Sequence, residues 1–452
     1  MRKGAQEMSE SKHDIRTHAK KEPDVKAKAE AKPAGSPEES AGNQKKKKSK
    51  GRKVLRALLI LILVLAAAVA GLVYRYYKQA EASLDLKFAE DPATVEFGEE
   101  CQAMDRVSEW TWEIEPEQRF LDTGSLGAKS IKYKVYRPLF GGLLTPSKEY
   151  QLEYLVVDTE APVTLWNGDG AVLELGTEFD IKNVIAYGDN ADPAPEVKVD
   201  GDVDMSTAGS YPLHVTVSDA SGNSTDWDLT VEVADELPSY EDDSERTAFK
   251  DFVSEYGGKG KTVGIDVSAW QDEVDFDAVK AAGCEFVIIR IGYSEDGKMT
   301  VDKRFDENIK KAKAAGLKTG VYLYTTDNTE EEIRASADQL IEKLGGETLD
   351  LPVAFDWEDF GSFQSYEMSF HDLNGLYDAF SDQLSQSGYE CMLYGSKNYL
   401  EKVWDNTDIR PVWLAHYTDK TDYEGPYYMW QASCTGRIDG IDGDVDMDVM
   451  YN

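Results

Sequence analysis

The chain has 452 residues, with 49 Lys and Arg against 85 Asp and Glu, and a net charge of −36 at pH 7. This length excludes a single hydrophobic core and suggests about three domains. The charge is unevenly divided, because residues 1–56 contain 17 Lys and Arg against 8 Asp and Glu, which leaves 32 against 77 for the rest. A short basic head therefore precedes a large acidic body.

Residues 1–56 are the basic head, and their composition predicts a disordered cytoplasmic segment. They are rich in Lys, Glu, Ala, Ser and Pro and almost lack large apolar side chains, so they cannot offset the entropy of ordering. The Lys-rich end of the head has the charge to bind nucleic acid. Because it adjoins an apolar run, a topology signal and contact with anionic lipid are favoured, and no nucleic-acid partner is expected.

Residues 57–77 predict a single transmembrane helix. From Ala57 to Tyr74 the chain has 18 residues without a charge, which is just long enough to span a membrane, and Tyr76 and Tyr77 add interfacial aromatics. The positive-inside rule keeps the basic head in the cytoplasm, so we expect a single-pass protein of the cell membrane with extracellular C-terminal domains. A cleaved signal peptide is the alternative, but this run starts far later than a signal normally does.

Two β-rich modules are predicted next, at residues 83–157 and 158–235. The sequence of residues 95–98 recurs 78 residues later as residues 173–176, and two longer strand patterns recur in the same order. Alternating strands between turn formers are typical of small β-sandwiches. With Thr207-Ala208-Gly209-Ser210-Tyr211 and Asp219-Ala220-Ser221-Gly222-Asn223, the second module resembles the bacterial immunoglobulin-like modules of surface proteins, and the first is a more divergent copy.

The function of the two modules is weakly specified by their sequence. Their aspartates could ligate calcium, but no run has ligands at the set offsets of a calcium loop; these residues are Asp200, Asp202, Asp204, and Asp189 with Asp192. We therefore expect no metal and no cofactor. A spacer that lifts the last domain off the membrane is favoured over adhesion or glycan binding.

The last domain follows an acidic and then Gly-rich linker at residues 236–260, and it spans residues 261–452. Strands and helices alternate through five βα units, which implies parallel strands wound into an open sheet or a barrel. Three further strands without helices between them end the pattern, near residues 412–415, 428–431 and 445–447. This ending favours a barrel of five βα units completed by β-strands.

Two carboxylates in this domain predict a hydrolytic site. Asp356 and Glu358 follow an apolar run that predicts a buried strand, and side chains two apart on a strand point to the same side. Asp266 ends the first predicted strand and Asp446 lies in the last, so all four should meet at the C-terminal mouth of a barrel. Desolvating two like charges without a purpose is costly, which favours a function for Asp356 and Glu358.

Several motifs of the last domain occur in the order found in one enzyme family. They are Gly264-Ile265-Asp266-Val267-Ser268-Ala269-Trp270-Gln271, Phe286-Val287-Ile288-Ile289-Arg290-Ile291-Gly292-Tyr293, Ala314-Ala315-Gly316, Gly320-Val321-Tyr322, Pro352-Val353-Ala354-Phe355-Asp356-Trp357-Glu358, Trp430-Gln431 and Val445-Asp446-Met447-Asp448. In combination they resemble the glycoside hydrolase family 25 lysozymes, N-acetylmuramidases that cut the β-1,4 bond between N-acetylmuramic acid and N-acetylglucosamine in peptidoglycan. The resemblance implies a shortened TIM-like (β/α)5β3 barrel.

The resemblance also implies roles for the four acids. Glu358 would be the general acid, because like-charge repulsion from Asp356 raises the cost of ionising it. Asp356 would stay ionised and stabilise the transition state, act as nucleophile or orient the substrate's N-acetyl group, and the sequence leaves that choice open. Asp266 and Asp446 would hold hydrogen bonds and shape the charge.

Aromatic side chains near the predicted strand ends are candidate sugar platforms. The predicted substrate-binding residues are Tyr322, Trp430, Gln431, Trp270 and Tyr394. A histidine metal site would need His371 and His416 to meet, and His416 was expected only to line the cleft. The cysteines show no metal spacing, and buried thiols are favoured over a bridge between Cys391 and Cys434.

These observations predict a membrane-anchored extracytoplasmic peptidoglycan hydrolase. Its expected partners are glycan strands of the wall, the membrane through one helix, and a protein of the cell wall or of a secretion or conjugation apparatus. Local remodelling or opening of the wall fits the tether better than bulk lysis. The alternative is a catalytically weak scaffold that binds the cell wall.

Overall fold

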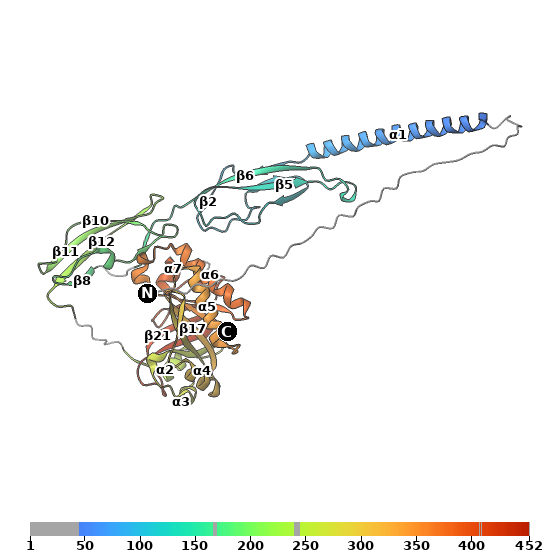
Figure 1. Ribbon diagram of the computed structural model, residues 1–452. Helices are drawn as coiled ribbons and strands as arrows, with labels where there is room; N and C mark the ends of the chain where they lie inside the picture. The colour runs from blue at the N-terminus through green and yellow to red at the C-terminus, as the bar shows by residue number, and fades with distance from the viewer. Residues whose placement is uncertain (1–44, 166–169, 239–244, 406, 408, 452) are drawn as a thin grey trace, which may run out of the picture. The chain divides into compact units, whose positions relative to one another are not determined.

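The computed structural model describes residues 45–165, 170–238, 245–405, 407 and 409–451. The chain divides into two compact units, Met1–Tyr76 and Tyr77–Asn452, and each is described by itself. The described part of the first unit is helical and belongs to α1 (Lys45–Ala82) (Figure 1). The end of this helix, after Tyr76, belongs to the second unit. Among the described residues, Gly51–Ala82 of α1 is the one helical segment long and apolar enough to cross a membrane.

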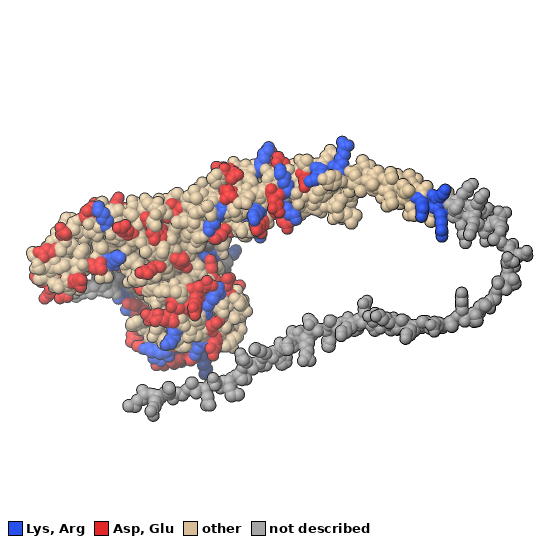
Figure 2. All heavy atoms as spheres, turned by 45° about the horizontal axis from the view of Figure 1, so that its top comes forward, with Lys and Arg blue, Asp and Glu red and all other residues tan. Residues whose placement is uncertain are grey.

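Helix α1 corrects the predicted boundaries of the basic head. Residues 1–44 lie outside the described part of the chain, but residues 45–56 are helical where we expected disorder. Lys and Arg are good helix formers, so a helix nucleated in the apolar run extends back through them. Figure 2 shows basic side chains toward one end of the described helix surface, followed by a stretch of that surface without charged side chains. The helix also runs beyond the predicted end at residue 77, to Ala82.

The first β module contains a four-stranded sheet and a two-stranded sheet. Its strands are β1 (Leu86–Phe88), β2 (Ala93–Glu96), β3 (Val107–Trp110), β4 (Glu113–Pro116), β5 (Gly127–Tyr136) and β6 (Ser147–Val157), with a short helix η1 (Phe140–Gly142). The larger sheet has the order β2-β6-β5-β4, and β1 pairs with β3. Strands β5 and β6 alternate buried and exposed residues, which is why one face of the sheet forms the core of the module.

The second β module repeats this pairing. Its strands are β7 (Val163–Thr164), β8 (Gly170–Glu174), β9 (Tyr187–Gly188), β10 (Glu196–Asp200), β11 (Gly209–Ser218) and β12 (Ser224–Ala234), with a short helix η2 (Ile181–Asn183). The larger sheet has the order β10-β11-β12-β8, and β7 pairs with β9. In both modules the last strand of the larger sheet, β6 or β12, pairs in parallel with its first strand, β2 or β8, so the sequence repeat corresponds to a repeat of strand pairing.

Eight strands of the described residues close into a barrel in the last part of the chain. They are β14 (Lys261–Val267), β15 (Phe286–Glu295), β17 (Lys318–Thr325), β18 (Val353–Asp356), β19 (Cys391–Ser396), β20 (Val412–Ala415), β21 (Met429–Arg437) and β22 (Val445–Tyr451). Neighbours from β14 to β21 pair in parallel, whereas β22 pairs antiparallel with both β21 and β14. The last strand therefore closes the barrel against the first.

Helices connect the first six barrel strands. They are α3 (Phe276–Ala281), α4 (Phe305–Ala314), α5 (Glu330–Leu344), α6 (Phe370–Gln386) and α7 (Lys397–Lys402). Helices α5 and α6 begin with capping boxes, in which Thr329 pairs with Glu332 and Ser369 pairs with Asp372. A further hairpin joins the end of β15 to β16 (Lys298–Val301), and β13 (Thr247–Ala248) with α2 (Phe249–Tyr256) precedes the barrel.

Side-chain alternation along the barrel strands separates two apolar clusters. One includes Ile288, Ala354 and Met392, and the other includes Val353 and Phe355 together with residues of the surrounding helices. All four residues of β18 are buried, so this strand has no solvent-exposed face. A polar side chain at its end therefore has to find its partners at the barrel mouth.

Candidate active site

The end of strand β18 positions the two central carboxyls. Asp356 is the last residue of the strand and is only 5% exposed, whereas Glu358 lies two residues further on and is exposed. A side-chain hydrogen bond joins the two carboxyls, so the structure brings them together as the sequence predicted. Asp356 also has one buried oxygen, Oδ1, without a hydrogen-bond partner among the described residues. This pair lies where a buried strand opens to solvent.

Trp357 anchors the backbone between these carboxyls. Its side chain is fully buried, and its indole Nε1 donates to the backbone oxygen of Asp327 at 3.2 Å. Three rings surround it at centroid distances of 5.0–5.8 Å, from Phe360, Phe363 and Tyr366. These rings belong to the short helix η4 (Phe360–Tyr366), which follows the pair directly. Packing of Trp357 thus fixes the direction in which its two acidic neighbours point.

Strands β14 and β22 bring the other two predicted acids to the same mouth. Asp266 of β14 lies opposite Asp446 of β22 in the antiparallel register. Asp448, two residues further along β22, is completely buried and accepts a hydrogen bond from Trp413 Nε1 at 2.8 Å. A hydrogen bond also links Asp266 to Asp448. The predicted pair is therefore part of a larger acidic cluster.

Gln431 connects this acidic cluster to tyrosine hydroxyls. Its Nε2 donates to Asp266 Oδ2 at 2.7 Å, and its Oε1 accepts from Tyr394 at 2.9 Å and from Tyr417 at 3.0 Å. Gln431 is only 3% exposed. Gln431, which we predicted to bind substrate, is thus placed to orient a carboxyl and two phenols that lie around it.

Burial raises the pKa of each acid in the cluster. The pKa of Asp266 lies well above its usual range because of burial and then the like charge of Asp448. Burial and the neighbouring Asp266 raise the pKa of Asp446 to about 9. Burial also holds the pKa of Asp448 well above its usual range. The cluster therefore retains protons at neutral pH, which limits the repulsion among its members.

The central pair shares a proton unequally. Burial, followed by the charge of Glu358, holds the pKa of Asp356 well above its usual range. Burial also raises the pKa of Glu358, but the hydrogen bond from Asp356 lowers it. We predicted that Asp356 stays ionised, but in the free protein the shared proton favours Asp356 because it is the more deeply buried carboxyl.

A cleft of about 510 Å³ opens beside the central pair. Glu358, Tyr394, Lys397, His416 and Tyr417 are among the residues that line it. His416 lines this cleft as predicted, but its Nδ1 pairs with Thr421 Oγ1 at 2.9 Å, which gives it a structural partner. The cleft thus presents an exposed carboxyl, a cation and aromatic rings to an entering molecule.

The remaining predicted binding residues lie in different environments. Tyr322 is half-buried in the barrel, where its ring lies 6.1 Å from that of Trp413. Trp430 is buried, and its Nε1 donates to the His416 backbone oxygen at 2.8 Å, so it supports the wall of the cleft. Trp270 is 83% exposed, in the short helix η3 (Ala269–Gln271) just after β14. Of these aromatic residues, Trp270 has the most freely accessible ring.

Sequence reasoning missed three residues of the site. Asp448 was part of a quoted motif, but nothing in the motif distinguished its complete burial from the position of Asp446. Lys397 begins α7 directly after β19, and Tyr417 lies in the loop after β20, where no sequence pattern singled them out. Only the strand order reveals that these segments adjoin Glu358, since β18, β19 and β20 are neighbours in the sheet.

Comparisons with known proteins match two separate regions of the chain. Residues 265–441 match the family described as glycosyl hydrolases family 25, and residues 163–233 match the bacterial surface protein, Ig-like domain. The autolytic lysozyme of Clostridium acetobutylicum is 30% identical over 188 residues, which are 41% of this chain and 54% of that protein. Lysozyme M1 of Streptomyces globisporus is 29% identical over 196 residues, which are 40% and 65% of the respective chains.

The chain thus spans between about half and two thirds of the length of these curated relatives. Among solved structures, the modular autolysin LytC from Streptococcus pneumoniae, in complex with a synthetic peptidoglycan ligand, is 25% identical with a TM-score of 0.40. That similarity covers 53% of this chain and 56% of LytC. The matched regions coincide with the barrel and the second β module, and the chain therefore contains a glycosyl hydrolases family 25 domain at residues 265–441 and a bacterial Ig-like domain at residues 163–233.

Proposed function

We propose that the protein is a peptidoglycan hydrolase that cleaves the β-1,4 bond between N-acetylmuramic acid and N-acetylglucosamine. The observation that carries this proposal is the Asp356–Glu358 pair at the end of a buried strand, facing a cleft of about 510 Å³ in the family 25 domain. Most glycosidases use two neighbouring carboxyls, one of which has a raised pKa and acts as the general acid. The names of the two curated relatives, both lysozymes, support the same substrate.

Glu358 acts as the general acid in this proposal. Its carboxyl is exposed in the free protein, so a glycan strand that fills the cleft removes water from it and raises its pKa further. The shared proton then moves from Asp356 to Glu358, which can protonate the glycosidic oxygen. Asp356 then becomes a carboxylate with one of three roles. It stabilises the oxocarbenium-like transition state, acts as the nucleophile on the sugar, or orients the substrate's N-acetyl group.

Asp266, Asp446 and Gln431 position the reacting groups. Asp266 accepts a hydrogen bond from Gln431 at 2.7 Å and lies opposite Asp446, and burial with neighbouring like charge raises the pKa of both acids. Tyr394 lines the cleft as a sugar platform, and Tyr322 and Trp270 extend the aromatic surface. Trp430 supports the cleft through its hydrogen bond to the backbone of His416.

The proposal extends to the architecture and location of the protein. The barrel, with five βα units followed by three strands, corresponds to a shortened TIM-like (β/α)5β3 barrel, and the first β module is a divergent immunoglobulin-like domain. Helix α1 anchors the chain in the cell membrane with residues 1–56 in the cytoplasm and the other domains outside. Its charge pattern supports this orientation, since basic residues precede the apolar run.

The tether restricts the enzyme to wall near the membrane, which fits local remodelling or the opening of the wall for a secretion or conjugation apparatus. The two β modules act as a spacer that sets the reach of the barrel. A protein of that apparatus or of the cell wall is the expected partner.

The first test is digestion of purified peptidoglycan by the full-length protein in detergent, with mass spectrometry of the new reducing ends. We expect wild type to create N-acetylmuramic acid ends and Glu358→Gln to lower the rate by about 10²–10⁴-fold, the usual contribution of a general acid. Glu342→Gln is the matched control, because Glu342 is exposed on the outer helix α5. If wild type binds several walls without cleaving them, the protein is a wall-binding scaffold instead.

A further inference from the structure

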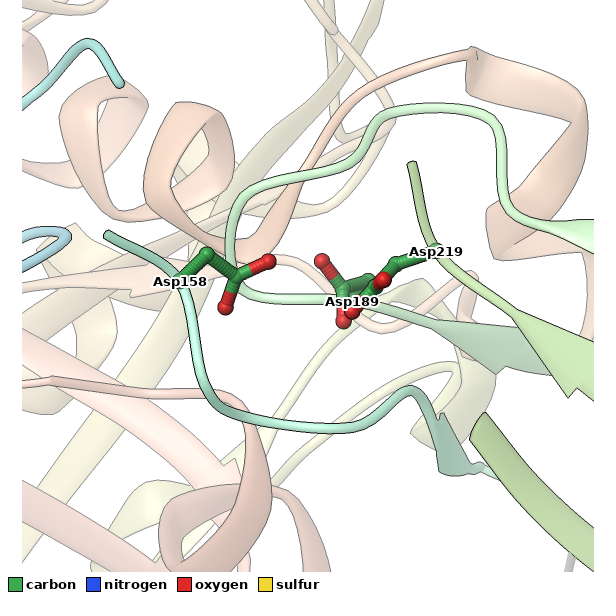
Figure 3. Close-up of side chains that lie close together, drawn as sticks. All are labelled: Asp158, Asp189 and Asp219. Atoms are coloured by element: carbon green, nitrogen blue, oxygen red, sulfur yellow. The ribbon is translucent and has the colours of Figure 1, made fainter. Parts of the chain in front are cut away.

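Three aspartates of the second β module bring their carboxylates together away from the barrel mouth. Asp158 follows β6, Asp189 follows β9 and Asp219 begins the turn between β11 and β12. One oxygen of each lies within 4.8 Å of one oxygen of the other two. Figure 3 shows the side chains converging from three separate segments, with the carboxylates of Asp158 and Asp189 facing each other. They are only 7%, 1% and 8% exposed, respectively.

Two of these carboxylates have buried oxygens without a partner. Asp158 Oδ2 and Asp189 Oδ2 make no hydrogen bond to a described residue, although both are shielded from solvent. Their other oxygens are occupied, since Asp189 Oδ1 accepts from Ala191 N at 2.9 Å and from Asp192 N at 2.7 Å. A buried polar atom left unpaired costs about 1–3 kcal/mol, so such atoms normally have a ligand.

The charges of the three aspartates are also uncompensated. None of the ion pairs found between described residues includes Asp158, Asp189 or Asp219. Burial raises the pKa of Asp189 to about 6, and the charges of the other two aspartates raise it as well. Three acidic side chains thus face one another in a shielded place without a cationic partner among the described residues, which is costly unless a cation joins them.

We propose that Asp158, Asp189 and Asp219 form a binding site for a hard divalent cation of the calcium class. Calcium takes six to eight oxygen ligands at about 2.3–2.6 Å, so two oxygens on opposite sides of the ion lie roughly 4.8 Å apart. The spread of the three carboxylates fits this limit. The group contains no histidine or cysteine, the ligands that zinc prefers.

Asn190 supplies a fourth oxygen to this site. Its Nδ2 donates to Asp158 Oδ1 at 3.3 Å, which places the amide beside one of the three carboxylates, and its Oδ1 is buried without a partner among the described residues. Carbonyl oxygens of asparagine are common calcium ligands, and they add no further negative charge. Water completes the coordination shell.

The position of the site suggests what the cation does. Asp158 joins the two β modules, and its backbone oxygen accepts from Asn223 Nδ2 at 3.2 Å in the turn that contains Asp219. The backbone oxygen of Asp189 accepts from Phe370 N at 2.8 Å, at the start of α6 in the barrel domain. A cation held here connects the entrance of the module, its β11–β12 turn and the loop that contacts the barrel domain.

The sequence did not reveal this site because its ligands are far apart in the chain. Calcium loops are recognised by ligands at short, fixed offsets, and we expected no metal for that reason. Asp158, Asp189 and Asp219 are each about 30 residues from the next. Only the folding of the module places them together.

The test measures calcium binding by the full-length protein in detergent after treatment with EDTA, using titration calorimetry and Tb³⁺ luminescence. We expect one site with a Kd of about 10⁻⁴–10⁻³ M, as for extracellular modules, and a higher melting temperature in calcium. Asp189→Asn should weaken binding at least about tenfold, because it removes one charged ligand. Asp204→Asn is the matched control in the same module, since Asp204 is exposed and bonds only to its own turn at Ser206 and Thr207.

The order of melting temperatures separates a cation site from a purely structural cluster. In EDTA, Asp189→Asn should melt at or above wild type because it relieves repulsion, whereas in saturating calcium wild type should melt higher. If Asp189→Asn fails to fold, Asp158→Asn provides the same comparison. The proposal is overturned if wild type binds no calcium at about 10 mM, or if binding is unchanged in the variant. A melting temperature that rises as the pH falls through about 6, without response to calcium, would also overturn it in favour of a shared proton.

Discussion

At the scale of single residues, Gln431 connects the acidic cluster to two phenols through three hydrogen bonds. Tyr394 and Tyr417 both donate to its Oε1, which leaves the amide nitrogen free to donate to the carboxyl on the other side. The nitrogen must then point at Asp266 Oδ2, which has to accept the hydrogen bond. A proton on Asp266 is therefore confined to its other oxygen, on the side of its hydrogen-bonded neighbour Asp448.

Asp446 predicts a pH dependence of stability. Its pKa of about 9 in the folded protein lies far above the usual aspartate value near 3.8, so the folded state holds a proton that the unfolded chain releases. The contribution of Asp446 to the free energy of unfolding is fully present below about pH 4, and it is lost as the pH rises toward 9. Asp446→Asn should therefore melt at least about 3 °C above wild type at pH 8, with a smaller difference at pH 5.

Thermal melting followed by circular dichroism at pH 5, 6.5 and 8 measures this difference. Asp439→Asn serves as the control, because Asp439 is exposed in the turn between β21 and β22. If the melting temperatures of wild type and Asp446→Asn change equally with pH, Asp446 is ionised in the folded protein and the prediction is wrong.

At the scale of elements, strand β18 and helix η4 form one unit around Trp357. The strand ends at Asp356, and the indole then turns into the aromatic cluster of η4 while Glu358 remains exposed. Alternation along an extended backbone explains why a buried aromatic residue separates the two acids. The packing of this tryptophan and the geometry of the acids are therefore coupled.

Substitutions of Trp357 test this coupling. Trp357→Ala should lower the free energy of unfolding by about 3–5 kcal/mol, because it leaves a cavity among the rings, and should abolish wall digestion. Trp357→Phe keeps most of the packing and loses only the hydrogen bond to Asp327, so it should cost about 1 kcal/mol and retain activity. Urea denaturation and the peptidoglycan assay measure both effects, and full activity in a folded Trp357→Ala protein would contradict the coupling.

Elements with regular periodicity were predictable from the sequence, and irregular ones were not. Helix α5 (Glu330–Leu344) belongs to the first kind, because its capping box and its apolar face are clear in the sequence. The hairpin of β15 and β16 was missed, although Asp296-Gly297 is a strong turn signal and both residues have positive φ angles of 52° and 69°. The aromatic helix η4 has no periodic pattern, so only tertiary packing defines it.

Much of the candidate site could also be predicted, because motif order identified Asp266, Asp356, Glu358 and Asp446. The distribution of protons could not be predicted, since it depends on which carboxyl is buried more deeply. Sequence alone treats Asp356 and Glu358 as equivalent neighbours, whereas the structure makes Asp356 nearly inaccessible and leaves Glu358 exposed. Burial depth is a property of the closed barrel and not of any local pattern.

At the scale of the whole molecule, the apolar surface of α1 is the feature that supports the proposed location. Its side chains from Leu58 to Leu65 are about half exposed or more, and no described residue covers this segment. An exposed apolar helix of this length is stable only in a membrane or against another apolar surface. The proposed anchor accounts for it without a further protein.

Extraction of membranes with alkaline carbonate tests the anchor. The full-length protein should stay in the pellet, and a variant lacking residues 51–76 should be released, because it has lost the apolar helix. A variant with residues 57–74 replaced by leucine should remain in the pellet, which controls for the exact sequence of the span. Release of the full-length protein, or equal amounts of free enzyme in the culture medium, would contradict membrane anchoring.

The register between the first and last barrel strands has a consequence for the order of events during synthesis. Asp266 lies on β14 and Asp446 on β22, so the acidic cluster is divided between the two strands whose pairing completes the barrel. A nascent or truncated chain that lacks β22 also lacks Asp446 and Asp448, and it leaves Asp266 without these neighbours. In the proposed hydrolase the acidic cluster is therefore complete only when β22 closes the barrel, so a chain that ends before this strand should lack activity.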